Sequence, residues 1–281
     1  MKRFTFPEFQ TIAYDEREDG VATVTLNRPD VHNAFNSLMQ RELHTLWRGL
    51  RRHDPVKCIV LTGAGEKAFC TGIDRMEQMG GEGDETTDPD IVGSGGVTPF
   101  MFNDPGDNIG PKSCDLWKPV IAAVNGMACG GAFYMLGEVE FIIAAEHATF
   151  FDPHVTYGMC AAFEPIHMSG IMPFPEIMRI SLMGNYERMS AQRAHQIGMV
   201  SEVVPGDQLL ARAQEVAGVI ASQPRLAIEG TVRAIWSTRE MPQREAVRLG
   251  YAYVAMGTSQ ESIAEGQKLF ASGKRVEWNL R

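Results

Sequence analysis

Two glycine-rich segments have the composition needed to place backbone N–H groups against a ligand. They cover residues 63–74 (GAGEKAFCTGID) and residues 125–134 (NGMACGGAFY). Each follows a short apolar stretch and leads into a stretch that we expect to be helical. Glycine lets the backbone approach a ligand closely, and a helix N-terminus offers unpaired N–H groups. Two such groups directed at one oxygen form an oxyanion hole, in which each donor stabilises developing negative charge by about 3–4 kcal/mol.

Two other interpretations of these segments stay open at this point. Each segment could be an ordinary strand-to-helix turn in which glycine only permits close packing. A dinucleotide-binding turn is a third option, but neither segment spells GxGxxG at a first strand–helix junction. In the first segment, Gly63 and Gly65 are followed by Lys67 and Ala68 rather than by the required glycine.

Short apolar strands separated by helical stretches must position these turns. Alternation and β-branched residues predict strands at residues 21–26, 58–62, 120–124, 141–145 and 148–151. Asn36 or Ser37 suits the N-cap of an amphipathic helix that follows the first of these strands. The alternation of strands and helices predicts an α/β fold.

The character of the sequence changes near Pro205. Four helices are predicted beyond it, at residues 209–221, 226–236, 243–256 and 260–272. We therefore predict a core over residues 1–205 and a helical C-terminal region over residues 206–281.

Residues 76–114 show little hydrophobic periodicity. They contain several glycines, four prolines and the acidic cluster Glu82, Asp84, Glu85, Asp88 and Asp90. An irregular segment of this length is typically either a functional lid or a disordered loop, and both interpretations stay open.

The bulk composition excludes several classes of protein. The chain has 281 residues, 44% of them hydrophobic and 22% charged, and a net charge of −9, which argues against a nucleic-acid binder. No signal peptide and no bilayer-spanning apolar run is visible, so we expect no membrane association. The five cysteines are scattered without CxxC spacing, which predicts neither disulfides nor a metal site. We expect a soluble cytoplasmic protein.

Taken together, the motifs resemble the enoyl-CoA hydratase/isomerase (crotonase) superfamily over nearly the whole chain. In chain order they are NRP at 27–29 with NA at 33–34, FCTGID at 69–74, KPVIAAVNGMACGG at 118–131, AQRAHQIGMVSEVV at 191–204, and the stretch 265–275. The resemblance implies a ββα spiral core and a C-terminal helical trimerisation region, hence a homotrimer or dimer of trimers. It also implies an acyl-CoA thioester substrate, with coenzyme A as part of the substrate and no separate cofactor.

The resemblance also assigns roles to individual residues. The backbone N–H groups of Ile73 and Gly131 would be the oxyanion donors. Coenzyme A would lie against Arg28 near its phosphates, and against Ala68, Thr71 and Gly72 at its adenine end.

Two positions depart from the family pattern. Hydratases of this family carry a glutamate at each of the positions that Tyr134 and His154 occupy here. Tyr134 lies three residues beyond Gly131, on the same face of a helix, and histidine is the commonest general base. Structural roles are the alternatives: a packed tyrosine ring, and a loop hydrogen bond from His154, for example to Asp152. Glu164 is the nearby carboxylate that could replace a missing catalytic glutamate.

The resemblance predicts an acyl-CoA enzyme that stabilises a thioester enolate oxyanion, of the enoyl-CoA hydratase or isomerase type. Hydration needs one group to activate water and another to deliver a proton to the α-carbon. Because both hydratase glutamates are replaced, we favour isomerisation, decarboxylation or thioester hydrolysis over hydration. The alternative is a catalytically silent acyl-CoA-binding or assembly protein.

Overall fold

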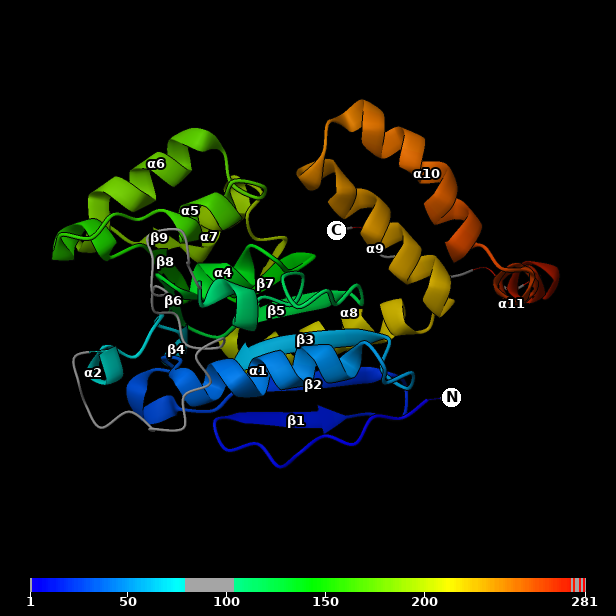
Figure 1. Cartoon of the computed structure of the whole chain (residues 1–281), viewed down its shortest axis with the longest axis horizontal. Helices are drawn as coiled ribbons and strands as arrows, with labels where there is room; N and C mark the ends of the chain where they lie inside the picture. Colours follow the sequence, from blue (N-terminus) through cyan, green and yellow to red (C-terminus); the bar gives the residue numbers. More distant parts are fainter. Residues whose placement is uncertain (1, 79–103, 274, 276–277, 279, 281) are drawn as a thin grey trace, which may run out of the picture.

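Two β-sheets form the centre of the structure (Figure 1). The computed structural model describes residues 2–78 and 104–273, together with residues 275, 278 and 280. The larger sheet has the order β1-β2-β3-β5-β7-β10, and the smaller has the order β4-β6-β8-β9. The strands of the larger sheet are β1 (Ile12–Glu16), β2 (Val21–Leu26), β3 (Cys58–Gly63), β5 (Val120–Val124), β7 (Phe141–Ala145) and β10 (Glu202–Val204). Those of the smaller sheet are β4 (Ala68–Cys70), β6 (Met127–Cys129), β8 (Thr149–Phe151) and β9 (Met189–Ser190).

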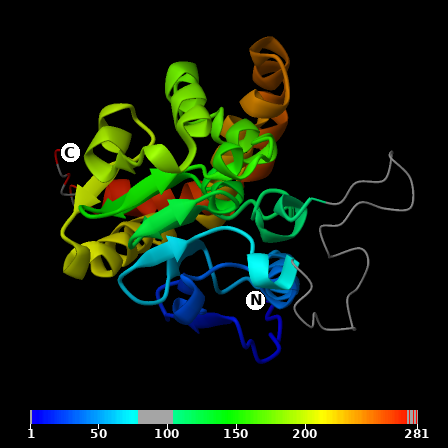
Figure 2. The same ribbon diagram turned by 90° about the vertical axis from the view of Figure 1, so that its left-hand side faces the viewer.

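The two sheets are built from one repeated unit. A strand of the larger sheet is followed at once by a strand of the smaller sheet, as in β3–β4, β5–β6 and β7–β8. Within each sheet these successive strands pair in parallel, while β1 and β9 are antiparallel edges. From the side, the strands run together through the middle of the molecule with helices around them (Figure 2). This arrangement confirms the predicted α/β fold with a ββα core, and the five predicted strands are present.

Eleven α-helices lie in the described part of the chain. They are α1 (Ser37–Leu50), α2 (Arg75–Gln78), α3 (Gly106–Ile109), α4 (Ala132–Leu136), α5 (Phe163–Met168), α6 (Phe174–Met183), α7 (Ala191–Gln196), α8 (Leu209–Ala221), α9 (Arg225–Glu240), α10 (Gln243–Gly257) and α11 (Gln260–Ala271). Four 3-10 helices add η1 (Pro29–Val31), η2 (His154–Tyr157), η3 (Gly184–Tyr186) and η4 (Gly206–Gln208).

Helix α1 begins where the sequence predicts. The Asn36 side chain accepts a hydrogen bond from the Met39 N–H at 2.9 Å, which satisfies one of the unpaired donors of the first turn. Leu43 and Leu46 are fully buried on the inner face of the helix. The indole N–H of Trp47 donates to the carbonyl oxygen of Ile109 at 3.0 Å and so joins α1 to α3.

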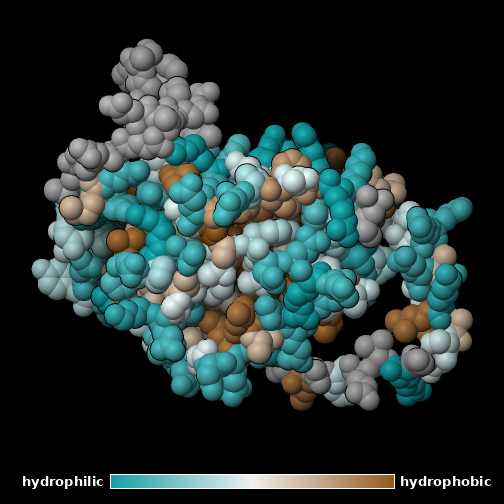
Figure 3. Space-filling model, turned by 90° about the horizontal axis from the view of Figure 1, so that it is seen from below, coloured by the Kyte–Doolittle hydropathy of each residue, from teal (hydrophilic) through white to brown (hydrophobic). Residues whose placement is uncertain are grey.

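The C-terminal helices divide into one that covers the core and three that extend from it. Ala213, Ala217 and Ala221 of α8 are buried in the core, because small side chains let the helix lie close to the larger sheet. Helix α9 contacts the core, since the indole N–H of Trp236 donates to Glu140 at 2.7 Å, and α10 and α11 extend outward from it at one end of the molecule (Figures 1 and 3). Helix α8 lies beyond residue 205 and still packs in the core. The division of the chain at residue 205 stays a prediction.

Part of the irregular segment 76–114 is helical. Its first residues belong to α2, and α3 lies near its end. Residues 79–103 lie outside the described residues, so the choice between a lid and a disordered loop stays open. In the ranges that the structure describes, no helix is both long and apolar enough to cross a membrane.

Candidate active site

The two glycine-rich segments lie side by side at one edge of the smaller sheet. Strands β4 and β6 pair in parallel, with Cys70 opposite Ala128, so the turns that follow them emerge together. Gly72 and Gly130 both have left-handed backbone conformations, with φ of 84° and 52°. A β-carbon on Gly72 would lie 2.9 Å from the Gly131 nitrogen. Glycine is therefore required at position 72 both by its conformation and by the close approach of the second turn.

The N–H groups of Ile73 and Gly131 are free to bind a ligand. Neither donates a hydrogen bond to any described residue, although the neighbouring backbone groups are paired. Phe35 fixes the first turn on both sides: its N–H donates to the Gly72 carbonyl at 2.9 Å, and its carbonyl accepts from the Asp74 N–H at 2.8 Å. Its ring packs against Gly131 of the second turn. Phe35 therefore holds the two turns, and with them the N–H groups of Ile73 and Gly131, in fixed relative positions.

Two side-chain amides, the buried Asn33 and the partly exposed Asn125, hold the strand ends that carry these turns. Asn33 Nδ2 donates to the Ala68 carbonyl at 2.8 Å and to the Ala64 carbonyl at 3.0 Å. Asn125 Nδ2 donates to the carbonyls of Gly63 and Gly65 at 2.9 and 2.7 Å. The asparagines of the first and third sequence motifs therefore have a structural function, which is to satisfy the exposed carbonyls of the 63–68 loop.

Arg28 is anchored to the first turn. Its Nη1 lies 2.9 Å from the Asp74 carboxylate and donates to the Ala34 carbonyl at 2.6 Å. Asp74 is the last residue of the FCTGID motif, one position beyond Ile73. The ion pair thus ties the loop that contains Arg28 to the turn that contains one predicted donor. The predicted contact of Arg28 with phosphates stays a prediction.

A cavity of about 330 Å³ lies next to these loops. Its walls are Pro29, Asp30, His32, Asn33, Ala64, Gly65, Glu66, Lys67 and Ala68. Ala68 is the one predicted coenzyme-contacting residue among them. Thr71 approaches the wall, since its hydroxyl lies 3.4 Å from the His32 carbonyl, while Arg28 and Gly72 lie outside.

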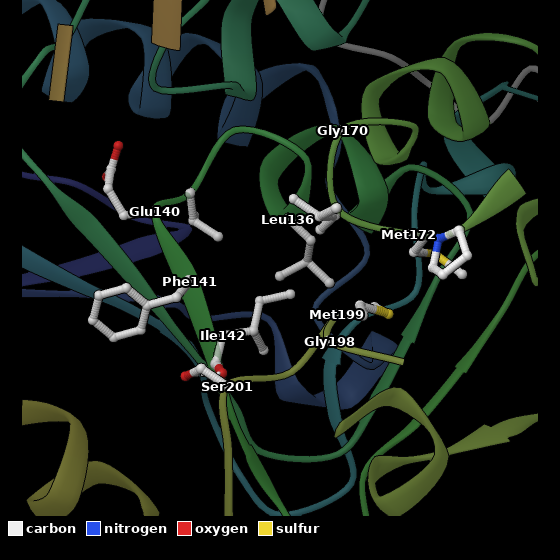
Figure 4. Close-up of a pocket in the computed structure, with 12 residues that line it drawn as sticks. Leu136, Glu140, Phe141, Ile142, Gly170, Met172, Gly198, Met199 and Ser201 are labelled. Carbon is white, nitrogen blue, oxygen red and sulfur yellow. Dashed lines mark hydrogen bonds between the residues drawn. The ribbon is translucent and has the colours of Figure 1, made fainter. Parts of the chain in front are cut away.

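A second cavity, of about 340 Å³, has no part in this arrangement. Figure 4 shows Leu136, Ile142 and Met199 grouped at its centre, with Glu140 and Phe141 at one end. None of the predicted site residues lines it.

Tyr134 occupies a buried position on α4, one turn beyond Gly131. Its hydroxyl lies 3.4 Å from Asp104 Oδ2, and its ring packs edge-on against His167 with centroids 5.4 Å apart. Burial raises the pKa of Tyr134, and the nearby carboxylates of Glu164 and Asp104 raise it further. The hydroxyl therefore stays protonated over the ordinary pH range and can only donate or accept a hydrogen bond.

His154 lies between two carboxylates and beside the second glycine turn. Its Nδ1 is 2.6 Å from Asp152 Oδ1, and its Nε2 is 3.3 Å from Glu164 Oε1. A β-carbon on Gly130 would lie 3.6 Å from the imidazole Cε1. The hydrogen bond to Asp152 raises the pKa of His154 against the opposing effect of burial, and the charge of Glu164 adds to the increase. Burial raises the pKa of Glu164.

The structure thus brings together all five residues predicted to act in catalysis. Tyr134, His154 and Glu164 form a cluster next to the turns that hold Ile73 and Gly131. Sequence reasoning missed Asp104, which lies within the irregular segment 76–114 and contacts Tyr134. The one sequence feature that marks this residue is the Asp-Pro-Gly turn at 104–106. In that turn the Asp104 carboxylate accepts a hydrogen bond from the Gly106 N–H at 2.8 Å. The described residues include no group of three or more acidic, histidine or cysteine side chains arranged to hold a metal ion.

Comparison with known proteins identifies the family. The enoyl-CoA hydratase/isomerase family model matches residues 16–281. The (E)-benzylidenesuccinyl-CoA hydratase of Thauera aromatica is 29% identical over 257 residues, which cover 91% of this chain and 94% of that protein. The carnitinyl-CoA dehydratase of Salmonella arizonae is 29% identical over 274 residues, covering 93% and 96%.

Solved structures agree with this assignment. The crystal structure of an enoyl-CoA hydratase/isomerase from Mycobacterium paratuberculosis is 36% identical, with a TM-score of 0.83 over 98% of this chain and all of that one. An enoyl-CoA hydratase from Bacillus anthracis is 26% identical, with a TM-score of 0.81 over 94% and 97% of the two chains. This chain belongs to the enoyl-CoA hydratase/isomerase (crotonase) family and is an acyl-CoA enzyme of that family.

Proposed function

We propose that this enzyme transfers a proton at the α-carbon of an acyl-CoA thioester and shifts a double bond along the acyl chain. The N–H groups of Ile73 and Gly131 would stabilise the enolate oxygen. The His154–Glu164 pair would remove the proton and return it. One observation carries this proposal: the pair lies directly beside the glycine turns, with 3.3 Å between Nε2 and Oε1.

Glu164 is the better candidate for the group that meets the substrate. Its carboxylate is buried and its pKa is raised by that burial, which makes it a stronger base than an exposed glutamate. His154 Nε2 lies 3.3 Å from this carboxylate and can hold it in place through a hydrogen bond while Glu164 carries the proton. A single base that removes a proton from one carbon and returns it to another is sufficient for isomerisation.

Hydration places a further demand on the site. A water molecule must be held and activated by one group while a second group delivers the proton. Here the hydroxyl of Tyr134 already lies near both Asp104 and Glu164, the carboxylates that could otherwise hold such a water. The Tyr134 hydroxyl therefore occupies the space next to these carboxylates where a water molecule would bind. This favours proton transfer without addition of water.

Reversible hydration is the second candidate, and the curated relatives support it. The two relatives described above are named as a hydratase and a dehydratase, and each aligns over more than nine-tenths of this chain. In that case Glu164 and Asp104 would form the pair that handles water, and Tyr134 would move aside when substrate binds.

Coenzyme A would bind as part of the substrate, with no separate cofactor. The cavity bounded by Ala64, Gly65 and Ala68 supports this, because its walls offer backbone groups and the cation of Lys67 next to the turn that holds Ile73. Arg28, Thr71 and Gly72 would contact the coenzyme at the margin of this cavity.

We also propose that the enzyme assembles as a homotrimer or a dimer of trimers. Helices α9, α10 and α11 extend from the core and expose large apolar side chains at Ile235, Val247, Val254, Met256 and Phe270. Apolar surface of this kind is typical of an interface between subunits.

Product analysis in deuterated water separates the candidate functions. A 3-enoyl-CoA should be converted into the 2-enoyl isomer with deuterium incorporated, and crotonyl-CoA should be hydrated at least about 100-fold more slowly, a difference typical of one missing acid–base group. Faster hydration than isomerisation would establish the second candidate. Binding of acyl-CoA without isomerisation, hydration or α-proton exchange would instead establish a catalytically silent binding protein.

A further inference from the structure

We propose that Asp152 is a positioning residue that fixes His154 with its proton on Nδ1 and so directs the basic nitrogen, Nε2, at Glu164. The inference deepens the proposed function and rests on it. Asp152 stands in the loop between β8 and η2 and is not among the residues that sequence analysis assigned to the site.

The geometry of Asp152 is that of an orienting group. Its Oδ1 accepts from the backbone N–H of His154 at 3.0 Å and lies 2.6 Å from the imidazole Nδ1. A carboxylate oxygen only accepts, so the Nδ1 at this distance must carry a hydrogen. The double contact fixes both the rotation of the ring and its tautomer.

The burial of Asp152 indicates that the function of its carboxylate is to interact with His154. Asp152 is fully buried, and its second oxygen, Oδ2, has no hydrogen-bond partner within the described structure. A buried carboxylate with an unpaired oxygen is costly, and among the described residues its ion-pair partner is His154, at 2.6 Å. A loop side chain needed only for packing would not require this charge.

The charges that face His154 come from several elements. Asp152 lies on its own loop, Glu164 comes from α5, and Arg75 from α2 acts on His154 as an opposing positive charge. Asp104 and Tyr134 act on Glu164 and not directly on the imidazole. The net effect is a raised pKa of His154. In the proposed mechanism the active pair holds one proton, on Nε2 of His154, beside the ionised Glu164.

This arrangement gives each atom a defined part in the reaction. Glu164 takes a proton from the α- or γ-carbon of the substrate, and the electron pair of that C–H bond becomes the enolate. Glu164 then delivers this proton to the other carbon, where an electron pair of the enolate forms the new C–H bond, while Nε2–H of His154 donates a hydrogen bond to the Glu164 carboxylate. Asp152 Oδ1 holds the Nδ1–H throughout and takes no proton itself.

The test combines a ring titration with an activity profile. Long-range ¹H–¹⁵N spectra of the labelled enzyme report the tautomer and the pKa of His154. In the wild type we expect an Nδ1–H tautomer that titrates above the ordinary value of about 6.5. In Asp152→Asn, which keeps the shape and removes the charge, the pKa should fall by about one pH unit, the size of a typical charge effect. The basic limb of the pH profile for α-proton exchange into butyryl-CoA should move down by the same amount.

A second histidine–carboxylate pair provides the matched control. His53 Nε2 lies 2.7 Å from Glu16 Oε2, where the loop after α1 meets the end of β1. Glu16→Gln should remove the carboxylate from this pair and leave the exchange profile unaltered.

The outcomes are distinct. An unchanged His154 pKa in Asp152→Asn, or an Nε2–H tautomer in the wild type, overturns the role of Asp152. If Asp152→Asn does not fold, the tautomer and pKa of the wild type decide alone. A shifted titration together with an absence of exchange in the wild type would confirm the positioning of His154 and refute the proposed function.

Discussion

The site has two halves that are built in different ways. The half proposed to face the thioester oxygen is made of backbone groups, Ile73 N–H and Gly131 N–H, held by parallel strands, Phe35 and the asparagines Asn33 and Asn125. The half proposed to face the acyl carbons is made of side chains from separate elements, namely Tyr134 on α4, His154 on η2 and Glu164 on α5. In the proposed mechanism the backbone half would bind the oxyanion and the side-chain half would determine which bond changes.

The difference has an energetic basis. Oxyanion donors need only a fixed position, and the pairing of β4 with β6 provides that position for the turns that follow the two strands. Acid and base groups need matched pKa values as well as position, and these depend on burial and on neighbouring charges. Substitution in each half should therefore have a distinct signature.

Removal of the carboxylate in the side-chain half should have the largest effect. Glu164→Gln should lower α-proton exchange about 1,000-fold, within the range for a general base, and leave binding of acyl-CoA unchanged. The exchange of butyryl-CoA protons in deuterated water measures the first, and calorimetric titration measures the second. Glu176→Gln is the matched control, since Glu176 also lies in the first turn of a helix, but pairs with Arg193 away from the site. Equal losses in both variants would contradict the assignment of Glu164.

Disturbance of the backbone half should come next. Gly72→Ala should reduce exchange about 100-fold, because the new methyl group displaces the Gly131 nitrogen that lies 2.9 Å away. Gly198→Ala is the control: it has nearly the same φ, 83° against 84°, with no atom within 4 Å of a new β-carbon. Thermal unfolding should show similar backbone strain in the two variants, and only Gly72→Ala should lose activity. Retention of full activity by Gly72→Ala would contradict the oxyanion assignment.

The pH profile should reveal the coupling between the two ionisable side chains. The active state holds one proton on the His154–Glu164 pair, so activity falls when the pair gains a second proton at low pH and when it loses its proton at high pH. Because the pKa values of both groups are raised, the acidic limb should lie above the usual glutamate value of about 4.3, and the basic limb above about 6.5. Steady-state rates between pH 4 and pH 10 measure both limbs. A profile with either limb at its ordinary value would show that the two groups do not share a proton.

Tyr134→Phe should have a smaller effect. Its hydrogen bond to Asp104 is long, at 3.4 Å, so exchange should fall about tenfold at most, the equivalent of one weak hydrogen bond. The same variant tests the role of the tyrosine in excluding water, since loss of the hydroxyl should raise the ratio of hydration to isomerisation. An unchanged product ratio would show that Tyr134 does not select the reaction.

Arg28→Gln should give the smallest change. If Arg28 contacts the coenzyme phosphates, KM for the CoA ester should rise about fivefold, equivalent to about 1 kcal/mol, while KM for the matching pantetheine ester stays constant. An equal rise for both esters would assign Arg28 to its ion pair with Asp74 alone.

The backbone half could be predicted from the sequence, and the side-chain half only in part. Gly72 and Gly131 are dictated by conformation and close approach, so their spacing after short apolar strands indicates the site directly. The five core strands were also predictable, because burial on both sides of a parallel sheet leaves continuous apolar runs. Tyr134 and His154 could be placed only by their position in the family motifs.

The remaining partners depend on tertiary contacts that no local pattern encodes. Glu164 reaches His154 because α5 folds back over α4, and Asp104 reaches Tyr134 after a long segment without periodicity. The raised pKa of His154 follows from these contacts and from Asp152, so it could not be derived from residue types alone.

A crystal structure with a bound saturated acyl-CoA thioester, such as butyryl-CoA, tests the central claim most directly. We expect the thioester oxygen within about 3 Å of both the Ile73 and the Gly131 nitrogens, the distance of a strong N–H···O hydrogen bond, with the α-carbon next to Glu164. An acyl group bound elsewhere, or a thioester oxygen that contacts neither nitrogen, would contradict the account.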